Sequence, residues 1–131
     1  MTSILLVEDH PIFAKVLLRF LVERGHMDVV GIARSAEEAL AQIPDLNVDL
    51  VLVDVSLPER SGIGLVLILH ETYPNLNCVM LSGHMSSQYA RRSLDAGARG
   101  YLIKDHPDAI LEGIQHVLDG EIYISEELRN F

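Results

Sequence analysis

Hydrophobic residues along the chain form short continuous runs, separated by longer stretches in which they recur at helical spacing. Five runs are predicted to be strands: Ser3–Val7, Val29–Ala33, Leu50–Val53, Cys78–Leu81 and Gly100–Ile103. Because apolar residues fill these runs without alternating with polar ones, each strand should be covered on both faces. This pattern is typical of a parallel sheet rather than of an antiparallel sheet with one face exposed to solvent.

The stretches between these runs predict five helices. They span Pro11 to about Gly25, Ser35 to about Ile43, Gly62–Tyr73, Ser86–Leu94 and Pro107–Leu118. Ser35 and Glu38 form a capping-box pattern, and Asp9 is expected to cap the first helix, with Pro11 in its first turn. Residues 121–131 carry no pattern that assigns them a shape.

Five alternations of strand and helix predict an α/β fold with right-handed crossovers. We expect a doubly wound, five-stranded parallel sheet of order 2-1-3-4-5, the flavodoxin-like arrangement, with helices on both faces. The length of 131 residues suits one domain, and a hydrophobic content of 49% excludes a disordered chain. The domain should occupy residues 1–120, and residues 121–131 should be a C-terminal extension or the start of a linker to an output domain.

Charge and cysteine content narrow the choice of partner and compartment. The net charge of −9 would repel a phosphate backbone, so residues 1–131 are not expected to bind nucleic acid directly. The apolar runs are far shorter than a membrane span, and the N-terminus lacks the pattern of a signal peptide. Cys78 is the only cysteine, which suits a reducing compartment. We therefore expect a cytoplasmic protein with no membrane contact.

Polar residues follow four of the predicted strands. Glu8 and Asp9 follow the first strand, Asp54 the third, Ser82 the fourth and Lys104 the fifth. In a doubly wound sheet the binding site lies outside the carboxyl ends of the strands, so these side chains should converge. Three neighbouring carboxylates repel one another, and a hard divalent cation such as Mg²⁺ relieves that repulsion. A carboxylate beside a metal, an ammonium and a hydroxyl is equipped for phosphoryl transfer.

These motifs together resemble the receiver domain of two-component response regulators. The resemblance covers Ser3 to about Gly120 and rests on Glu8-Asp9, on Asp54 with Leu57-Pro58 and Gly62, on Ser82-Gly83, and on Tyr101 with Lys104-Asp105. The segment GARGYLIKD, residues 97–105, is similar to the branch whose output domain is a LuxR-type helix-turn-helix.

The resemblance implies a metal-dependent phosphorylation site. Asp54 would accept a phosphoryl group from the phosphohistidine of a sensor histidine kinase. Asp9 and Asp54 would ligate Mg²⁺ directly, together with the backbone carbonyl of Ser56, and Glu8 would act mainly through a metal-bound water. The domain would be a regulatory phosphoacceptor and not an enzyme, since it would catalyse only its own phosphorylation and dephosphorylation.

The resemblance also implies a conformational switch. Lys104 would contact one phosphoryl oxygen, and Ser82 would hydrogen-bond another and be drawn toward it. The ring of Tyr101 would move inward as Ser82 shifts, which is a population shift between two states. His84 lies two residues past Ser82, so we also consider it as a modulator of dephosphorylation.

Several alternatives stay open. The natural protein could continue into a helix-turn-helix output domain, or it could be a free-standing receiver that acts through protein contacts only. A homodimer is plausible. A flavin-binding protein would share the sheet order, but the acidic loop at residues 8–11 would cradle a phosphate poorly. An aspartyl phosphatase usually carries a second acid two residues past the nucleophile, where this chain has Ser56. A degenerate receiver would lack some of the acidic residues that are present here.

Overall fold

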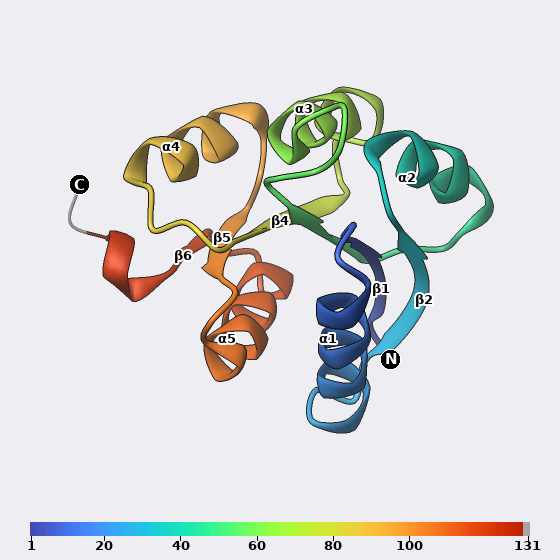
Figure 1. Cartoon of the computed structure of the whole chain (residues 1–131), viewed down its shortest axis with the longest axis horizontal. Coiled ribbons are helices and arrows are strands. Elements are labelled where there is room, and N and C mark those ends of the chain that lie inside the picture. Colours follow the sequence, from blue (N-terminus) through green and yellow to red (C-terminus); the bar gives the residue numbers. More distant parts are fainter. Residues whose placement is uncertain (130–131) are drawn as a thin grey trace.

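The computed structural model describes residues 1–129 and contains one parallel sheet of six strands with helices on both faces (Figure 1). The strands are β1 (Ser3–Val7), β2 (Asp28–Ala33), β3 (Leu50–Asp54), β4 (Asn77–Ser82), β5 (Gly100–Ile103) and β6 (Tyr123–Ile124). Their spatial order is β2-β1-β3-β4-β5-β6, and every neighbouring pair is parallel. The predicted doubly wound fold and the order of its first five strands are thus confirmed.

The helices divide between the two faces of this sheet. They are α1 (Pro11–Glu23), α2 (Ala36–Gln42), α3 (Gly62–Thr72), α4 (Ser87–Ala96) and α5 (Pro107–Leu118), with short 3-10 turns η1 (Ile43–Asp45) and η2 (Glu126–Leu128). Helices α1 and α5 cover one face, and α2, α3 and α4 cover the other (Figure 1). Successive side chains of a strand point to opposite faces, so each strand contributes to two hydrophobic cores. In β1, for example, Leu5 and Val7 pack toward α2 to α4, and Ile4 and Leu6 pack toward α1 and α5.

Strand β3 lies at the centre of the fold and is buried along its whole length. It pairs with β1 on one side and with β4 on the other, and Asp54 is aligned with Leu81 of β4. The four apolar residues Leu50–Val53 are fully buried, which holds the strand firmly in place. Asp54 therefore stands at a fixed position on the carboxyl edge of the sheet.

The first helix is capped by His10 and not by Asp9, so the expected cap was wrong. The Nδ1 atom of His10 accepts a hydrogen bond from the backbone N–H of Phe13 at 3.4 Å. Proline is favoured at the first helical position, which makes the residue before it the cap. Since Pro11 is that first residue, Asp9 lies one position too early and remains free to face the end of the sheet.

The C-terminal residues add a sixth strand that the sequence pattern did not predict. Tyr123 and Ile124 pair with Gly100 and Tyr101 of β5, and the turn η2 follows them. Tyr123 and Leu128 are buried in the two cores. Most of the expected extension thus packs on the domain, while its last two residues, 130 and 131, lie outside the described part of the chain.

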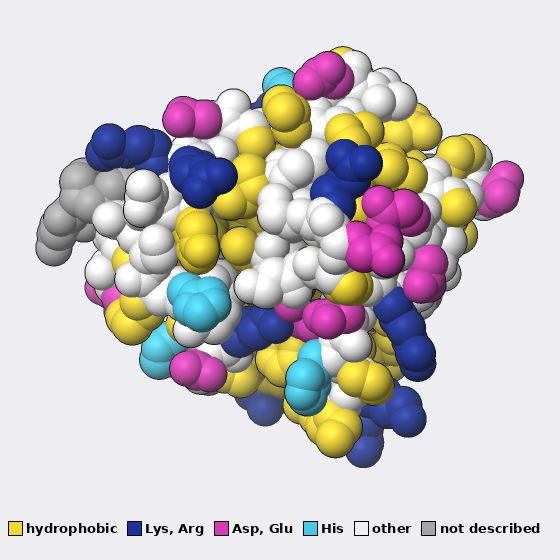
Figure 2. All heavy atoms as spheres, turned by 45° about the horizontal axis from the view of Figure 1, so that its top comes forward, with side chains coloured by type: hydrophobic (Ala, Val, Ile, Leu, Met, Phe, Trp, Pro, Cys, Tyr) yellow, Lys and Arg dark blue, Asp and Glu magenta, His cyan; other side chains and the backbone are white. Residues whose placement is uncertain are grey.

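The surface carries charges of both signs. Acidic and basic side chains lie intermixed over the face shown in Figure 2. None of the helices within residues 1–129 has the length and apolar character needed to cross a membrane.

Candidate functional site

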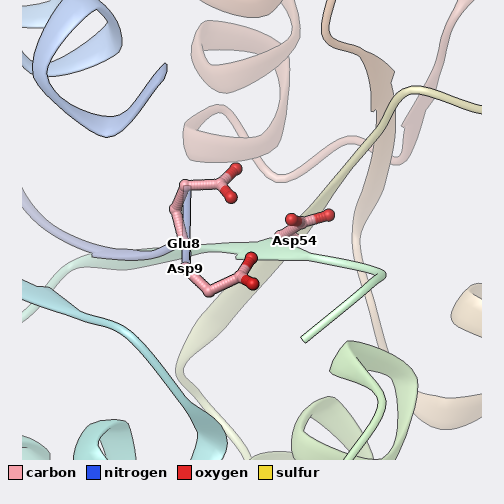
Figure 3. A group of neighbouring side chains, drawn as sticks. All are labelled: Glu8, Asp9 and Asp54. Carbon is pink, nitrogen blue, oxygen red and sulfur yellow. The ribbon is translucent and has the colours of Figure 1, made fainter. Parts of the chain in front are cut away.

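Three carboxylates converge at the carboxyl edge of the sheet (Figure 3). Glu8 and Asp9 follow β1 and Asp54 ends β3, and one oxygen from each lies within 4.8 Å of the others. Glu8 and Asp54 are buried, with only 1% and 5% of their surfaces exposed, whereas Asp9 is exposed to solvent. The cluster therefore has a buried floor and one open side, through which an ion or a substrate can enter.

Lys104 supplies the positive charge at this cluster. Its Nζ atom lies 2.7 Å from Oε1 of Glu8 and 3.1 Å from Oδ2 of Asp54. The same Nζ atom also lies over the ring of Phe13, in the first turn of α1, at 4.6 Å from the ring centroid. Each of these charged groups lies at the carboxyl end of one strand, β1, β3 or β5. The fold thus brings together residues up to 96 positions apart in the chain, from Glu8 to Lys104.

Burial and the neighbouring charges together set the pKa values of Glu8 and Lys104. Burial raises the pKa of Glu8 from 4.5 to about 7, an effect to which the neighbouring Asp54 adds and which Lys104 opposes. Burial by itself would lower the pKa of Lys104, but the two carboxylates outweigh it and hold that pKa above its usual value. Lys104 therefore keeps its positive charge at neutral pH, in a site whose carboxylates crowd one another.

The two oxygens of Glu8 have different partners. The backbone N–H of His10 donates to Oε2 at 3.1 Å. Oε1 is buried and is paired with the ammonium of Lys104 at 2.7 Å. Three carboxylates with one oxygen each within 4.8 Å of the others are suited to a hard cation such as Mg²⁺. The residues present therefore fit such an ion.

The loop after β3 folds tightly against Asp54. The backbone N–H of Ser56 donates to Oδ1 of Asp54 at 3.1 Å, and the N–H of Gly62 donates to the carbonyl of Val55 at 2.8 Å. A Cβ atom on residue 62 would overlap the backbone carbonyl of Asp54, so only glycine fits there. With Oδ1 held by Ser56 and Oδ2 by Lys104, the carboxylate of Asp54 is fixed in orientation.

Ser82 and Tyr101 both form hydrogen bonds to His84, in the loop after β4. The hydroxyl of Ser82 accepts from the N–H of His84 at 2.9 Å and donates to its carbonyl at 3.3 Å. The hydroxyl of Tyr101 donates to the same carbonyl at 3.2 Å, and its ring is completely buried. Burial raises the pKa of this phenol. Tyr101 is thus already in the inward position while Ser82 still contacts His84, whereas the resemblance implied an inward movement only as Ser82 shifts. The side chain of His84 is exposed.

The structure brings Glu8 and Asp54 into direct contact with Lys104, gathers Asp9 into the same carboxylate cluster, and places Ser82 at the end of the neighbouring strand β4. Sequence reasoning missed two contributors. The N–H of His10 orients Glu8, and the ring of Phe13 covers Lys104. Proline at position 11 is the signal that could have identified His10 as the cap, while an aromatic residue on an amphipathic helix gives no sign that it covers a charged group.

A family model for the response regulator receiver domain matches residues 4–115 of the chain. Among curated proteins, the transcriptional activator protein ExaE of Pseudomonas putida is 39% identical over 127 residues, which is 96% of this chain and 59% of that protein. The DNA-binding transcriptional activator DevR/DosR of Mycobacterium tuberculosis is 36% identical over 105 residues, which is 80% of this chain and 48% of that protein. The chain spans about half to three fifths of the length of these relatives.

Solved structures show the same similarity. A two-component response regulator of the LuxR family from an Aurantimonas species superposes with a TM-score of 0.93 at 28% identity, covering 98% of this chain and 93% of that one. A CheY-like receiver domain protein from Methanospirillum hungatei superposes with a TM-score of 0.81 at 31% identity, covering 92% and 95%.

Proposed function

The chain belongs to the response regulator receiver domain family, whose curated members similar to it are largely transcriptional regulators, and we propose that it is a phosphorylation-switched signalling receiver. A sensor histidine kinase is the proposed phosphoryl donor and Asp54 the acceptor. The observation that carries the proposal is the convergence of Asp54, two further carboxylates and Lys104 at one edge of the sheet.

In the proposed reaction a carboxylate oxygen of Asp54 attacks the phosphorus of the donor's phosphohistidine in line with the bond that breaks. An O–P bond forms, the P–N bond to the imidazole breaks, and the imidazole nitrogen leaves with the bonding electrons and takes up a proton. The contacts from Ser56 and Lys104 fix the orientation of the attacking carboxylate. The ammonium of Lys104 is near enough to neutralise a phosphoryl oxygen of the product.

The proposed cofactor is Mg²⁺, held by Glu8, Asp9, Asp54 and the backbone carbonyl of Ser56. When bound, the ion supplies positive charge that neutralises phosphoryl oxygens and the crowded carboxylates. The carboxylates of Glu8 and Asp9 are the protein's own contributions to this binding, with Glu8 acting mainly through a metal-bound water. Phe13 and the buried walls of β1 and β3 limit the access of water to the inner side of the site.

Ser82 and Tyr101 are the proposed switch. To donate a hydrogen bond to a phosphoryl oxygen, the hydroxyl of Ser82 has to leave the carbonyl of His84, which it now contacts at 3.3 Å. Tyr101 donates to the same carbonyl and can hold the loop in place after Ser82 has turned away. His84 is a candidate modulator of dephosphorylation, since its side chain is exposed beside Ser82. An unchanged lifetime of the phosphorylated protein in His84→Ala would remove it from this role.

The proposed output is transcriptional control through a helix-turn-helix domain outside residues 1–131. Relatives named as transcriptional regulators are longer than this chain, and RcsB, whose structure shares this fold, has been solved as dimers bound to DNA. Residues 1–131 themselves would not bind nucleic acid or contact a membrane, and they would work in the cytoplasm. Pairing into a homodimer is part of the same proposal. The second candidate, a free-standing receiver, would act through protein contacts alone, and the gene sequence past codon 131 separates the two.

The proposed chemistry is tested by incubating the protein with acetyl phosphate and Mg²⁺ and measuring its intact mass. We expect one phosphoryl adduct on the wild type and on Asp45→Asn, a control that changes an exposed carboxylate in η1. The adduct should be missing in Asp54→Asn. Equal labelling of the wild type and Asp54→Asn would overturn the proposal.

A further inference from the structure

Ser125 is a buried serine in the C-terminal segment, by which we mean residues 123–128. Only 2% of its surface is exposed, and it lies beyond the residues that the family model covers. Its hydroxyl accepts a hydrogen bond from the backbone N–H of Ile103 at 3.0 Å. Its own N–H donates to the carbonyl of Tyr101 at 2.9 Å. Ser125 is therefore tied to strand β5 at two points.

The bond to Ile103 occurs where the backbone ladder has ended. Strand β6 pairs with Gly100 and Tyr101 only, so its main chain does not satisfy the N–H of Ile103. The hydroxyl of Ser125 is the acceptor for this N–H in place of a main-chain carbonyl. A buried N–H without an acceptor costs free energy, so loss of this hydroxyl would destabilise the end of β5.

Ile103 directly precedes Lys104, whose ammonium contacts Glu8 and Asp54. On the opposite side of β5, the N–H of Lys104 donates to the carbonyl of Ser82 at 2.9 Å. The backbone that carries the lysine is therefore clamped between β4 and the side chain of Ser125. A shift of that backbone has to change one of the two bonds.

The C-terminal segment touches the same region at two further places. Leu128 is buried in the core that contains Tyr101 and Ile103. Glu127 lies beside the loop that follows Lys104, with its Oε1 atom 3.5 Å from Nε2 of His106. These contacts link the C-terminal segment to Tyr101, Ile103 and His106, all within three positions of Lys104 in the chain, while its outer surface stays exposed at Glu126 and Glu127.

We propose that Ser125 is a positioning residue for Lys104, and that through it the C-terminal segment responds to the state of the acidic cluster. The inference rests on the proposed function, in which Lys104 contacts a phosphoryl oxygen. When the ammonium moves from the carboxylates to that oxygen, the peptide between Ile103 and Lys104 turns, and the hydrogen bond to Ser125 carries this change into residues 123–128. By the same coupling, loss of the bond lets Lys104 leave its place over Asp54.

The first test compares phosphorylation rates with acetyl phosphate and Mg²⁺ in three variants. Ser125→Ala removes the acceptor, and Ser125→Thr restores a hydroxyl. Ser35→Ala is the matched control, because it also removes a serine acceptor of a backbone N–H, at the start of α2. We expect Ser125→Ala to be slower by about two- to tenfold, the span that corresponds to one neutral hydrogen bond. Ser125→Thr should recover most of the rate, and Ser35→Ala should match the wild type.

The second test follows hydrogen exchange of the backbone amides in residues 121–129. Phosphorylation should change exchange there in the wild type and in Ser35→Ala, and the change should be lost in Ser125→Ala. The inference would be overturned if Ser125→Ala were phosphorylated at the same rate as the wild type and showed the same change in hydrogen exchange on phosphorylation. If Ser125→Ala does not fold, Ser125→Cys replaces it, since a thiol of similar size is a weak acceptor.

A wild type that takes up no phosphoryl group would overturn the proposed function, and the positioning of Lys104 can still be decided. The NMR resonances of the Lys104 side chain without phosphoryl donor then provide the readout. A shift of these resonances in Ser125→Ala, absent in Ser35→Ala and reversed in Ser125→Thr, supports the positioning role. Identical resonances in all variants contradict it.

Discussion

At the scale of single residues, the site depends on Asp54 being held from several directions at once. Ser56 and Lys104 bind its two oxygens, and Gly62 starts α3 directly against its backbone carbonyl. The sequence predicted which residues gather here, because each one follows a buried strand and parallel strands end at a common edge. It could not predict which oxygen each partner contacts, since that depends on packing between elements distant in the chain.

Gly62→Ala should destabilise the protein by about 1 to 3 kcal/mol, because the added methyl group overlaps the carbonyl of Asp54. Gly64→Ala is the matched control in the same helix. A Cβ atom there would meet only ordinary contacts, the nearest at 3.5 Å, so its stability should rise by up to about 1 kcal/mol. Urea unfolding measures both, and equal effects of the two variants would contradict the tight approach of α3 to Asp54.

Glu8 should make the metal-free protein less stable as pH rises. Its pKa of about 7 in the folded state exceeds the value of 4.5 expected when unfolded, so the folded protein binds more protons between these two pH values. Stability should fall by roughly 1 to 3 kcal/mol between pH 4.5 and 7. Urea unfolding in EDTA should show this slope in the wild type and in the exposed-site control Glu23→Gln, and a flatter one in Glu8→Gln. A wild type with pH-independent stability would refute the burial argument.

At the scale of elements, the five predicted strands and five helices are present, and the surprise is at the C-terminus. Strand β6 has only two residues, Tyr123 and Ile124, too few for any periodic pattern to be recognised. What makes it a strand is the exposed edge of β5 beside it, a partner that sequence periodicity does not reveal. The same limit applies to Ser125, because its hydroxyl accepts from the N–H of Ile103, more than twenty residues away in the chain.

A chain that ends at residue 120 should therefore be less stable than one that ends at residue 129. The shorter chain loses the burial of Tyr123 and Leu128 and exposes the edge of β5. We expect a loss of about 2 to 5 kcal/mol, measured by urea unfolding. Equal stability of the two chains would show that residues 121–129 do not belong to the folded unit, as the predicted boundary at residue 120 supposed.

At the scale of the whole molecule, the sheet order places the ends of β1, β3 and β5 around one cluster of opposite charges. Lys104 offsets part of the carboxylate repulsion, but the carboxylates outnumber it three to one. The carboxylates at this edge of the sheet therefore repel one another, and a divalent cation would relieve that repulsion.

Mg²⁺ should therefore stabilise the folded protein. By mass action the gain is about 2.7 kcal/mol at a metal concentration of 100 times Kd. Thermal unfolding across millimolar Mg²⁺ should show a rising midpoint in the wild type and a much smaller rise in Asp9→Asn, which lacks one carboxylate of the cluster. A midpoint independent of Mg²⁺ in the wild type would mean that the cluster does not bind the ion.

The most direct measurement of the central claim is to locate the phosphoryl group within the chain. The protein is incubated with acetyl phosphate and Mg²⁺, the acyl phosphate is reduced with borohydride, and the peptides are sequenced by mass spectrometry. The account predicts that the reduced residue is Asp54, with no other carboxylate converted. Conversion of Glu8 or Asp9 in place of Asp54, or of no residue at all, would contradict it.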